Sequence, residues 1–73
     1  MANLEKKYQV FIGKKIREYR EKMGVSQEQF GKLSKFHRTY IGMIERGEKN
    51  ITIVNLTRVA KALKVQVRDL IDF

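Results

Sequence analysis

The first 24 residues carry a stripe of apolar side chains at helical spacing. Apolar residues recur at every third or fourth position, as on one face of an α-helix, and they are Leu4, Tyr8, Phe11, Ile12, Ile16, Tyr19 and Met23. Gly24 follows the last of them, and glycine readily takes the left-handed conformation that ends a helix. The chain contains no proline, the strongest helix breaker. We therefore predict a long first helix that ends at Gly24.

A short second helix is predicted to begin at Ser26. Ser26 and Gln29 have the spacing of a capping box, in which each side chain accepts a hydrogen bond from the other residue's backbone amide. Phe30 and Leu33 are expected to form the inner face of this helix. Lys35-Phe36 then makes a tight connection to the next element.

A third helix is predicted to follow this connection. His37 is its expected N-cap, and the helix runs to about Arg46 before Gly47 stops it. Ile41 and Ile44 stand three positions apart, so they are expected to point inward together.

The segment after a loop at residues 48–51 has the pattern of a fourth helix. Thr52 has an N-cap side chain. Apolar residues at i, i+3, i+4 and i+7 form the inner face, and basic residues lie on the other side: Leu56, Val59, Ala60 and Leu63 against Arg58, Lys61 and Lys64. A last short helical turn carries Val67, Leu70 and Ile71, although residues 65–68 also alternate as in an edge strand. The predicted fold is all-α, a compact bundle of about five helices.

Composition limits what such a bundle can be. The chain has 73 residues, which indicates one small domain over residues 1–73. Folding at this size buries only about 60% of the unfolded surface, so the stability of a monomer is expected to be marginal. The absence of cysteine excludes disulfides and cysteine-bound zinc. With 16 Lys and Arg against 8 Asp and Glu, the net charge is +8, which indicates a polyanionic partner, nucleic acid first.

The remaining composition indicates a cytoplasmic protein with no enzymatic activity. No apolar run approaches the roughly 18 residues of a membrane span, and the first residues lead into a charged stretch rather than an export signal. His37 is the only histidine, and there is no phosphate-binding loop and no carboxylate pair in a plausible cleft. We therefore expect no catalytic residue, no metal site and no cofactor.

Two short helices joined by a turn of about three residues form a helix-turn-helix arrangement. Ser-Gln-Glu-Gln-Phe-Gly at 26–31, followed by His-Arg-Thr-Tyr-Ile-Gly-Met-Ile-Glu-Arg-Gly at 37–47, resembles the Cro/CI-type repressor family over about residues 12–70. The resemblance implies a lambda-repressor-like DNA-binding domain with the helix-turn-helix at helices two and three. Residues 37–51 look most like the controller proteins of restriction–modification systems, small dimeric regulators that both activate and repress their own operon.

In such a domain the N-terminal turn of the third helix reads base edges in the major groove. The expected base-contacting residues are Arg38, Thr39, Tyr40 and Met43. Arg38 can make a bidentate contact to guanine, and Met43 can touch a thymine methyl group. The alternatives are a solvated charge for Arg38, and packing against a neighbouring helix for Tyr40 and Met43.

A second set of residues is expected to hold the DNA backbone, which fixes register without reading sequence. They are Gln27, Lys35, His37, Arg46, Lys49 and Asn50. Gln27 opens the second helix, where free amides favour a phosphate, and its side chain can also brace the third helix. His37 lacks the partners of a metal site, so a helix cap or a phosphate contact is expected of it.

The resemblance also implies a structural ion pair. In the family, a glutamate at the position of Glu45 pairs with an arginine near the end of helix one, and Arg20 occupies that place. We therefore expect a partly buried Arg20–Glu45 pair that joins helix one to helix three.

Three positions depart from good helix or turn chemistry. The family has glycine where this chain has Lys35, which implies strain if the turn needs a positive φ. Gly31 stands where the family has alanine, and Gly42 lies inside the third helix. Each glycine lowers the stability of its helix by about 1 kcal/mol.

The expected partners are a palindromic double-stranded DNA operator and a second copy of the chain, with RNA polymerase as a further candidate and no membrane. Residues 63–73 are expected to form the dimer contact through Val65, Val67, Leu70, Ile71 and Phe73; alternatively, Leu70 and Ile71 cap the monomer core. The function that follows is a sequence-specific transcriptional regulator, of the controller type. A phage or plasmid repressor, an antitoxin-type autoregulator, and a protein-interaction module without specific DNA binding are the alternatives.

Overall fold

The computed structural model describes residues 2–73, with side chains from residue 6 onward. Its helices are α1 (Ala2–Met23), α2 (Gln27–Ser34), α3 (Arg38–Glu45), α4 (Ile53–Leu63) and α5 (Val67–Leu70). Within residues 2–73 there are five helices and no strand, so the predicted all-α bundle is confirmed. The competing edge strand at 65–68 is not formed, because α5 begins at Val67.

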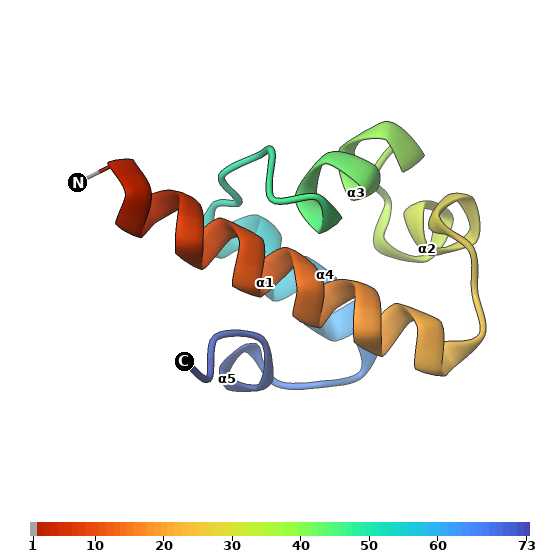
Figure 1. The fold of residues 1–73 in the computed structure, drawn as a ribbon. Coiled ribbons are helices and arrows are strands. Elements are labelled where there is room, and N and C mark those ends of the chain that lie inside the picture. Colours follow the sequence, from red (N-terminus) through yellow and green to blue (C-terminus); the bar gives the residue numbers. More distant parts are fainter. Residues whose placement is uncertain (1) are drawn as a thin grey trace.

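The long helix α1 is the element on which the others pack. It crosses the front of the molecule, with α4 behind it, α2 and α3 on one side and α5 on the other (Figure 1). Each helix contributes to a single core, whose buried apolar residues are Ile16, Phe30, Ile41, Ile44, Leu56, Val59, Ala60, Leu63 and Leu70. The inner faces predicted for α3 and α4 are therefore confirmed. No described helix is both long and apolar enough to cross a membrane.

The inner faces of the first two helices differ in part from the prediction. Leu33 is wrong as a core residue, because its surface is 55% exposed. The prediction for Phe30 is confirmed, and Gly31 and Ser34 complete the buried face of the eight-residue helix α2. Ser34 can be buried because its hydroxyl donates to the carbonyl of Phe30 at 2.8 Å. On α1 the stripe enters the core at Ile16, and the predicted role of Leu4 lies outside the described side chains.

Two glycines allow backbones to approach closely. A Cβ atom at Gly13 of α1 would collide with the carbonyl oxygen of Ile44 and lie 2.9 Å from that of Glu45, so α1 and α3 can pack here only without a side chain. A Cβ atom at Gly31 would lie 2.6 Å from the carbonyl oxygen of Phe36. Glycine at position 31 is therefore a packing requirement of this turn, which explains the departure from alanine.

The helix ends follow the predicted chemistry. Ser26 and Gln29 form both hydrogen bonds of a capping box, at 3.0 and 2.8 Å. Thr52 caps α4 by accepting from the backbone amide of Asn55 at 3.1 Å. Gly24 takes a φ of +75° directly after α1. These local signals fix where the chain turns between one helix and the next.

Candidate nucleic-acid interface

The first turn of α3 presents Arg38 and Thr39 to solvent. His37 is the N-cap, as predicted: its Nδ1 accepts from the backbone amide of Thr39 at 3.0 Å. The guanidinium of Arg38 lies 3.8 Å from the carboxylate of Glu28 on α2, and both side chains are exposed. Because an exposed pair at this distance is weak, Arg38 remains available to another partner.

A buried polar network supports α3 from behind. Arg20 of α1 donates from Nε and Nη2 to the two carboxylate oxygens of Glu45, at 2.6 and 3.1 Å. The side chains are only 11% and 2% exposed, so the pair predicted from the family resemblance is present and buried. The hydrogen bond to Glu45 raises the pKa of Arg20. Arg20 also donates to the carbonyl of Val25 at 2.8 Å, which ties the α1–α2 connection to the same pair.

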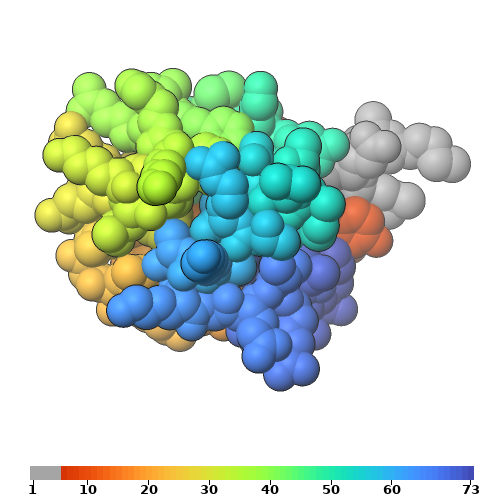
Figure 2. Space-filling view, turned by 180° about the vertical axis from the view of Figure 1, so that it is seen from behind, coloured from red at the N-terminus to blue at the C-terminus, as the bar shows by residue number. Residues whose placement is uncertain are grey.

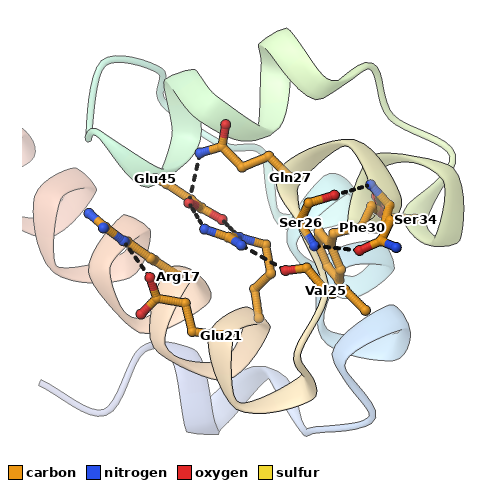
Figure 3. A network of polar contacts seen from close by, with 10 residues as sticks. Arg17, Glu21, Val25, Ser26, Gln27, Phe30, Ser34 and Glu45 are labelled. Carbon is orange, nitrogen blue, oxygen red and sulfur yellow. Dashed lines mark hydrogen bonds and ion pairs between the residues drawn. The ribbon is translucent and has the colours of Figure 1, made fainter.

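Gln27, the first residue of α2, joins this network from the outside. Its Nε2 donates to Oε1 of Glu45 at 3.0 Å, so its side chain braces α3 (Figure 3). Gly42 makes room for this arrangement, since a Cβ atom there would lie 3.4 Å from Oε1 of Gln27 and 3.0 Å from Nη1 of Arg46. The glycine inside α3 thus lets two long side chains lie over the helix.

The other two predicted base-contacting residues are partly buried. The ring of Tyr40 lies 4.8 Å from that of Phe36, and its hydroxyl accepts from Nδ2 of Asn55 on α4 at 3.0 Å. Tyr40 therefore packs between the turn and α4, as the alternative to base contact predicts. Met43 is half-buried, one turn beyond the exposed Thr39.

The loop after α3 carries the predicted backbone-contacting residues Arg46, Lys49 and Asn50, all of them exposed. Arg46 donates from Nε and Nη2 to the carboxylate of Glu48 at 2.9 and 3.1 Å. This pairing raises the pKa of Arg46 and lowers the pKa of Glu48. The nearby charge of Lys6 lowers the pKa of Glu48 further. Lys6 also donates to the carbonyl of Gly47 at 2.6 Å, so α1 holds this loop in place.

The turn between α2 and α3 is strained, as its sequence implies. Lys35 is exposed and has a φ of +63°, in the left-handed region that favours glycine. Arg58 of α4 reaches this turn: its Nη2 donates to the carbonyl oxygens of Ser34 and Lys35 at 3.2 and 3.0 Å. The apolar spacing of α4 predicts Arg58 on the solvent side of the helix and gives no sign of this contact, because no spacing along the chain relates residues 35 and 58.

The C-terminal residues expected at a dimer contact divide into two groups. Leu70 is fully buried within the chain, so it caps the monomer core and is not available to a second copy. Val65, Val67 and Ile71 are half-buried against the core, and Phe73 is 63% exposed. The ring of Phe73 lies 4.6 Å from that of Tyr8 and 4.9 Å from that of Phe11.

In the described part of the chain, no group of three His, Asp or Glu residues could hold a metal ion.

The geometry is that of two helices joined by a tight turn, with the second helix exposing its first turn. A family model described as helix-turn-helix (HTH_3) matches residues 16–70, which include all of α2 to α5. The chain belongs to the helix-turn-helix family. Membership of this family makes it a DNA-binding regulator, as the sequence predicts.

Three relatives within the helix-turn-helix family are control or controller proteins. Control protein C.BamHI of Bacillus amyloliquefaciens is 43% identical over 65 residues, covering 88% of this chain and 80% of that protein. Control protein C.SmaI of Serratia marcescens is 43% identical over 60 residues, covering 82% of this chain and 71% of that protein. The crystal structure of the restriction-modification controller protein C.AhdI from Aeromonas hydrophila is 38% identical with a TM-score of 0.86, covering 90% of this chain and 96% of that one. The resemblance to controller proteins seen in the sequence is confirmed.

Proposed function

We propose that this chain is a controller protein of a restriction–modification operon, a homodimeric regulator that binds a two-fold operator and controls transcription there. The observation that carries the proposal is the exposed first turn of α3, with Arg38 and Thr39 outward, held from behind by the buried Arg20–Glu45 pair. The likeness to C.BamHI, C.SmaI and C.AhdI supports the controller subtype.

Two exposed side chains on α3 read the bases in this proposal. The guanidinium of Arg38 leaves its weak pair with Glu28 and donates to O6 and N7 of a guanine, a contact worth about 1–3 kcal/mol of discrimination. Thr39 offers a hydroxyl donor to a base or a methyl group to thymine. Met43 contributes an apolar contact one turn further, and Tyr40 acts from behind by fixing α3 rather than by touching a base.

The phosphates on either side are held by residues outside α3. Lys35 and His37 approach the backbone from the turn, and Lys49 and Asn50 approach it from the following loop. Arg46 joins them once a phosphate competes with Glu48 for its guanidinium. Gln27 binds a phosphate less directly, since its amide is committed to Glu45 and only the start of α2 faces outward.

A second copy completes the reading unit, because natural operators of this motif are two-fold sites. In our proposal residues 63–73 form the contact through the half-buried Val65, Val67 and Ile71 and the exposed Phe73, with Leu70 excluded by its burial. The protein works in the cytoplasm, on the nucleoid, and RNA polymerase is its further partner at the operon.

Selection of bound duplexes from a random pool, followed by binding at several salt concentrations, tests this function. We expect a two-fold consensus, and an affinity that falls steeply with salt because bound cations are released from the DNA. Sedimentation at tens of micromolar protein should show a dimer. No preference over random duplex, or a monomer at that concentration, would contradict the proposal.

A further inference from the structure

The strained turn before α3 is held by a side chain from α4. Nη2 of Arg58 donates to the carbonyl oxygens of Ser34 and Lys35, at 3.2 and 3.0 Å. The same guanidinium lies over the ring of Phe36, 4.0 Å from its centroid. Three consecutive residues, from the last residue of α2 into the turn after it, therefore contact one arginine. The space-filling view from behind shows the surfaces of α2 and α4 next to each other (Figure 2).

These contacts meet two needs of the turn. The carbonyl oxygens at the C-terminal end of a helix lack partners within the helix, and Arg58 supplies donors to two of them. Lys35, with its φ of +63°, occupies a conformation that a residue with a Cβ atom adopts at a cost in free energy. A guanidinium suits this place because it is planar: it can stack on an aromatic ring and donate from its edge at the same time.

This turn also fixes the start of α3. Phe36, stacked under Arg58, packs against Tyr40 of α3 with ring centroids 4.8 Å apart. The hydroxyl of Tyr40 accepts from Asn55, which lies three positions before Arg58 on the same face of α4. Asn55 and Arg58 thus hold α3 and its preceding turn at two points, outside the apolar core.

We infer that Arg58 is a positioning residue for DNA reading: it fixes the left-handed turn at Lys35, and through that turn the angle at which Arg38 and Thr39 meet the bases. The inference rests on the proposed function, since it assigns Arg58 a part in base preference. It differs from a phosphate contact by Arg58, in which the side chain would bind DNA directly and leave base preference unchanged.

A double-mutant cycle in the free protein tests the hold on the turn. Arg58→Ala, Lys35→Gly and the double variant are compared with the parent by urea unfolding, and Lys61→Ala removes the same charge from α4 as the control. Arg58→Ala should raise the unfolding equilibrium constant in both backgrounds. The parent can recover part of this loss because its strained turn can relax once Arg58 is gone, whereas a glycine turn has no strain to relieve, so the increase should be about twofold to fivefold larger in the glycine background. Equal losses in the two backgrounds would overturn the inference.

Binding measurements separate positioning from a phosphate contact. Two duplexes are compared: the selected duplex, and one changed at the base that Arg38 reads. Arg58→Ala should reduce the preference for the selected duplex by about fivefold or more. The salt dependence of its DNA affinity should equal that of Lys61→Ala. Arg58→Lys keeps the charge but loses the planar stack, and it should lose preference as well. If Arg58→Ala keeps the preference and Arg58→Lys restores affinity, Arg58 is a phosphate ligand and the inference is wrong. If the parent prefers no duplex, the proposed function fails, and the unfolding cycle still decides whether Arg58 holds the turn.

Discussion

Arg20 on α1 and Glu45 at the end of α3 form a two-pronged ion pair inside the protein, 25 residues apart in sequence. Both oxygens of the carboxylate are engaged by the guanidinium, and Gln27 donates a third hydrogen bond to it. Among the described side chains, no buried polar atom lacks a partner. The pair is therefore fully compensated, and its value lies in the fixed relation that it sets between α1, α2 and α3.

Removal of one partner should be costly. Arg20→Ala leaves the carboxylate of Glu45 buried and unpaired, so we expect a loss of about 3–5 kcal/mol in the free energy of unfolding. Arg17→Ala, which breaks the exposed pair with Glu21 on the same helix, is the control and should cost less than about 1 kcal/mol. Urea unfolding measures both. Similar unfolding midpoints for the two variants would show that the buried pair has no structural role.

The same substitution at two glycines should have different effects on stability. Gly13→Ala places a methyl group into the backbone of α3, and we expect a loss of about 1–3 kcal/mol or more in the free energy of unfolding. Gly42→Ala meets only the flexible ends of Gln27 and Arg46, so the gain of about 1 kcal/mol in helix propensity should offset the crowding. Thermal or urea unfolding compares them. A tolerated alanine at position 13 would rule out the close approach of α1 and α3.

Two lysines occupy the left-handed conformation, which offers a route to a more stable protein. Lys35 ends α2 with a φ of +63°, and Lys64 ends α4 with a φ of +61°. Lys64→Gly should relieve about 1–2 kcal/mol of backbone strain. Part of this gain is offset because glycine has more conformational freedom in the unfolded chain, so we expect the free energy of unfolding to rise by up to about 1 kcal/mol. The unfolding midpoint measures this gain. Lys61→Gly, inside α4, is the control and should lose about 1 kcal/mol; a loss in both variants would argue against the left-handed turn.

Glu48 is expected to restrain DNA binding. Its ion pair with Arg46 lowers the pKa of Glu48, so the carboxylate stays charged throughout neutral pH, and the pair is lost only as the pH falls through that lowered value. Glu48→Gln frees Arg46 for a phosphate, which should raise DNA affinity about twofold to fivefold and steepen the salt dependence by about one unit.

The matched control for Glu48→Gln is Glu21→Gln. It removes the same charge from the exposed pair with Arg17 on α1, outside the candidate interface. Titration of the selected duplex at several salt concentrations should leave this control close to the parent. An equal gain from both variants would assign the effect to net charge alone, and weaker binding by Glu48→Gln would contradict a role for Arg46 at the DNA.

Much of the fold follows from local chemistry that the sequence displays. Ser26 and Thr52 are capping residues whatever surrounds them, and Ile41 and Ile44 share a face because of helical geometry alone. The prediction for Leu33 is wrong because an eight-residue helix does not itself define which of its sides meets the core. The burial of Ser34 in place of Leu33 depends on how the neighbouring helices pack, a tertiary relation that periodicity does not contain.

The candidate interface was predictable to a similar degree. Arg38, Thr39, Lys49 and Asn50 are exposed where the family resemblance places them. The burial of Tyr40 and the reach of Arg58 were not predictable, because both depend on contacts between α4 and the turn, which only the folded chain brings together. Leu70 likewise could be assigned to the core or to a partner only once α5 was placed.

The most direct test of DNA reading by α3 compares the base preferences of Arg38→Ala and Lys49→Ala by selection from a random duplex pool. We predict that Arg38→Ala loses the preference at one position of each half-site, about 1–3 kcal/mol, and keeps the rest of the pattern. Lys49→Ala should keep every preference, bind all duplexes more weakly and reduce the salt slope by about one unit. An unchanged base pattern for Arg38→Ala would contradict the account.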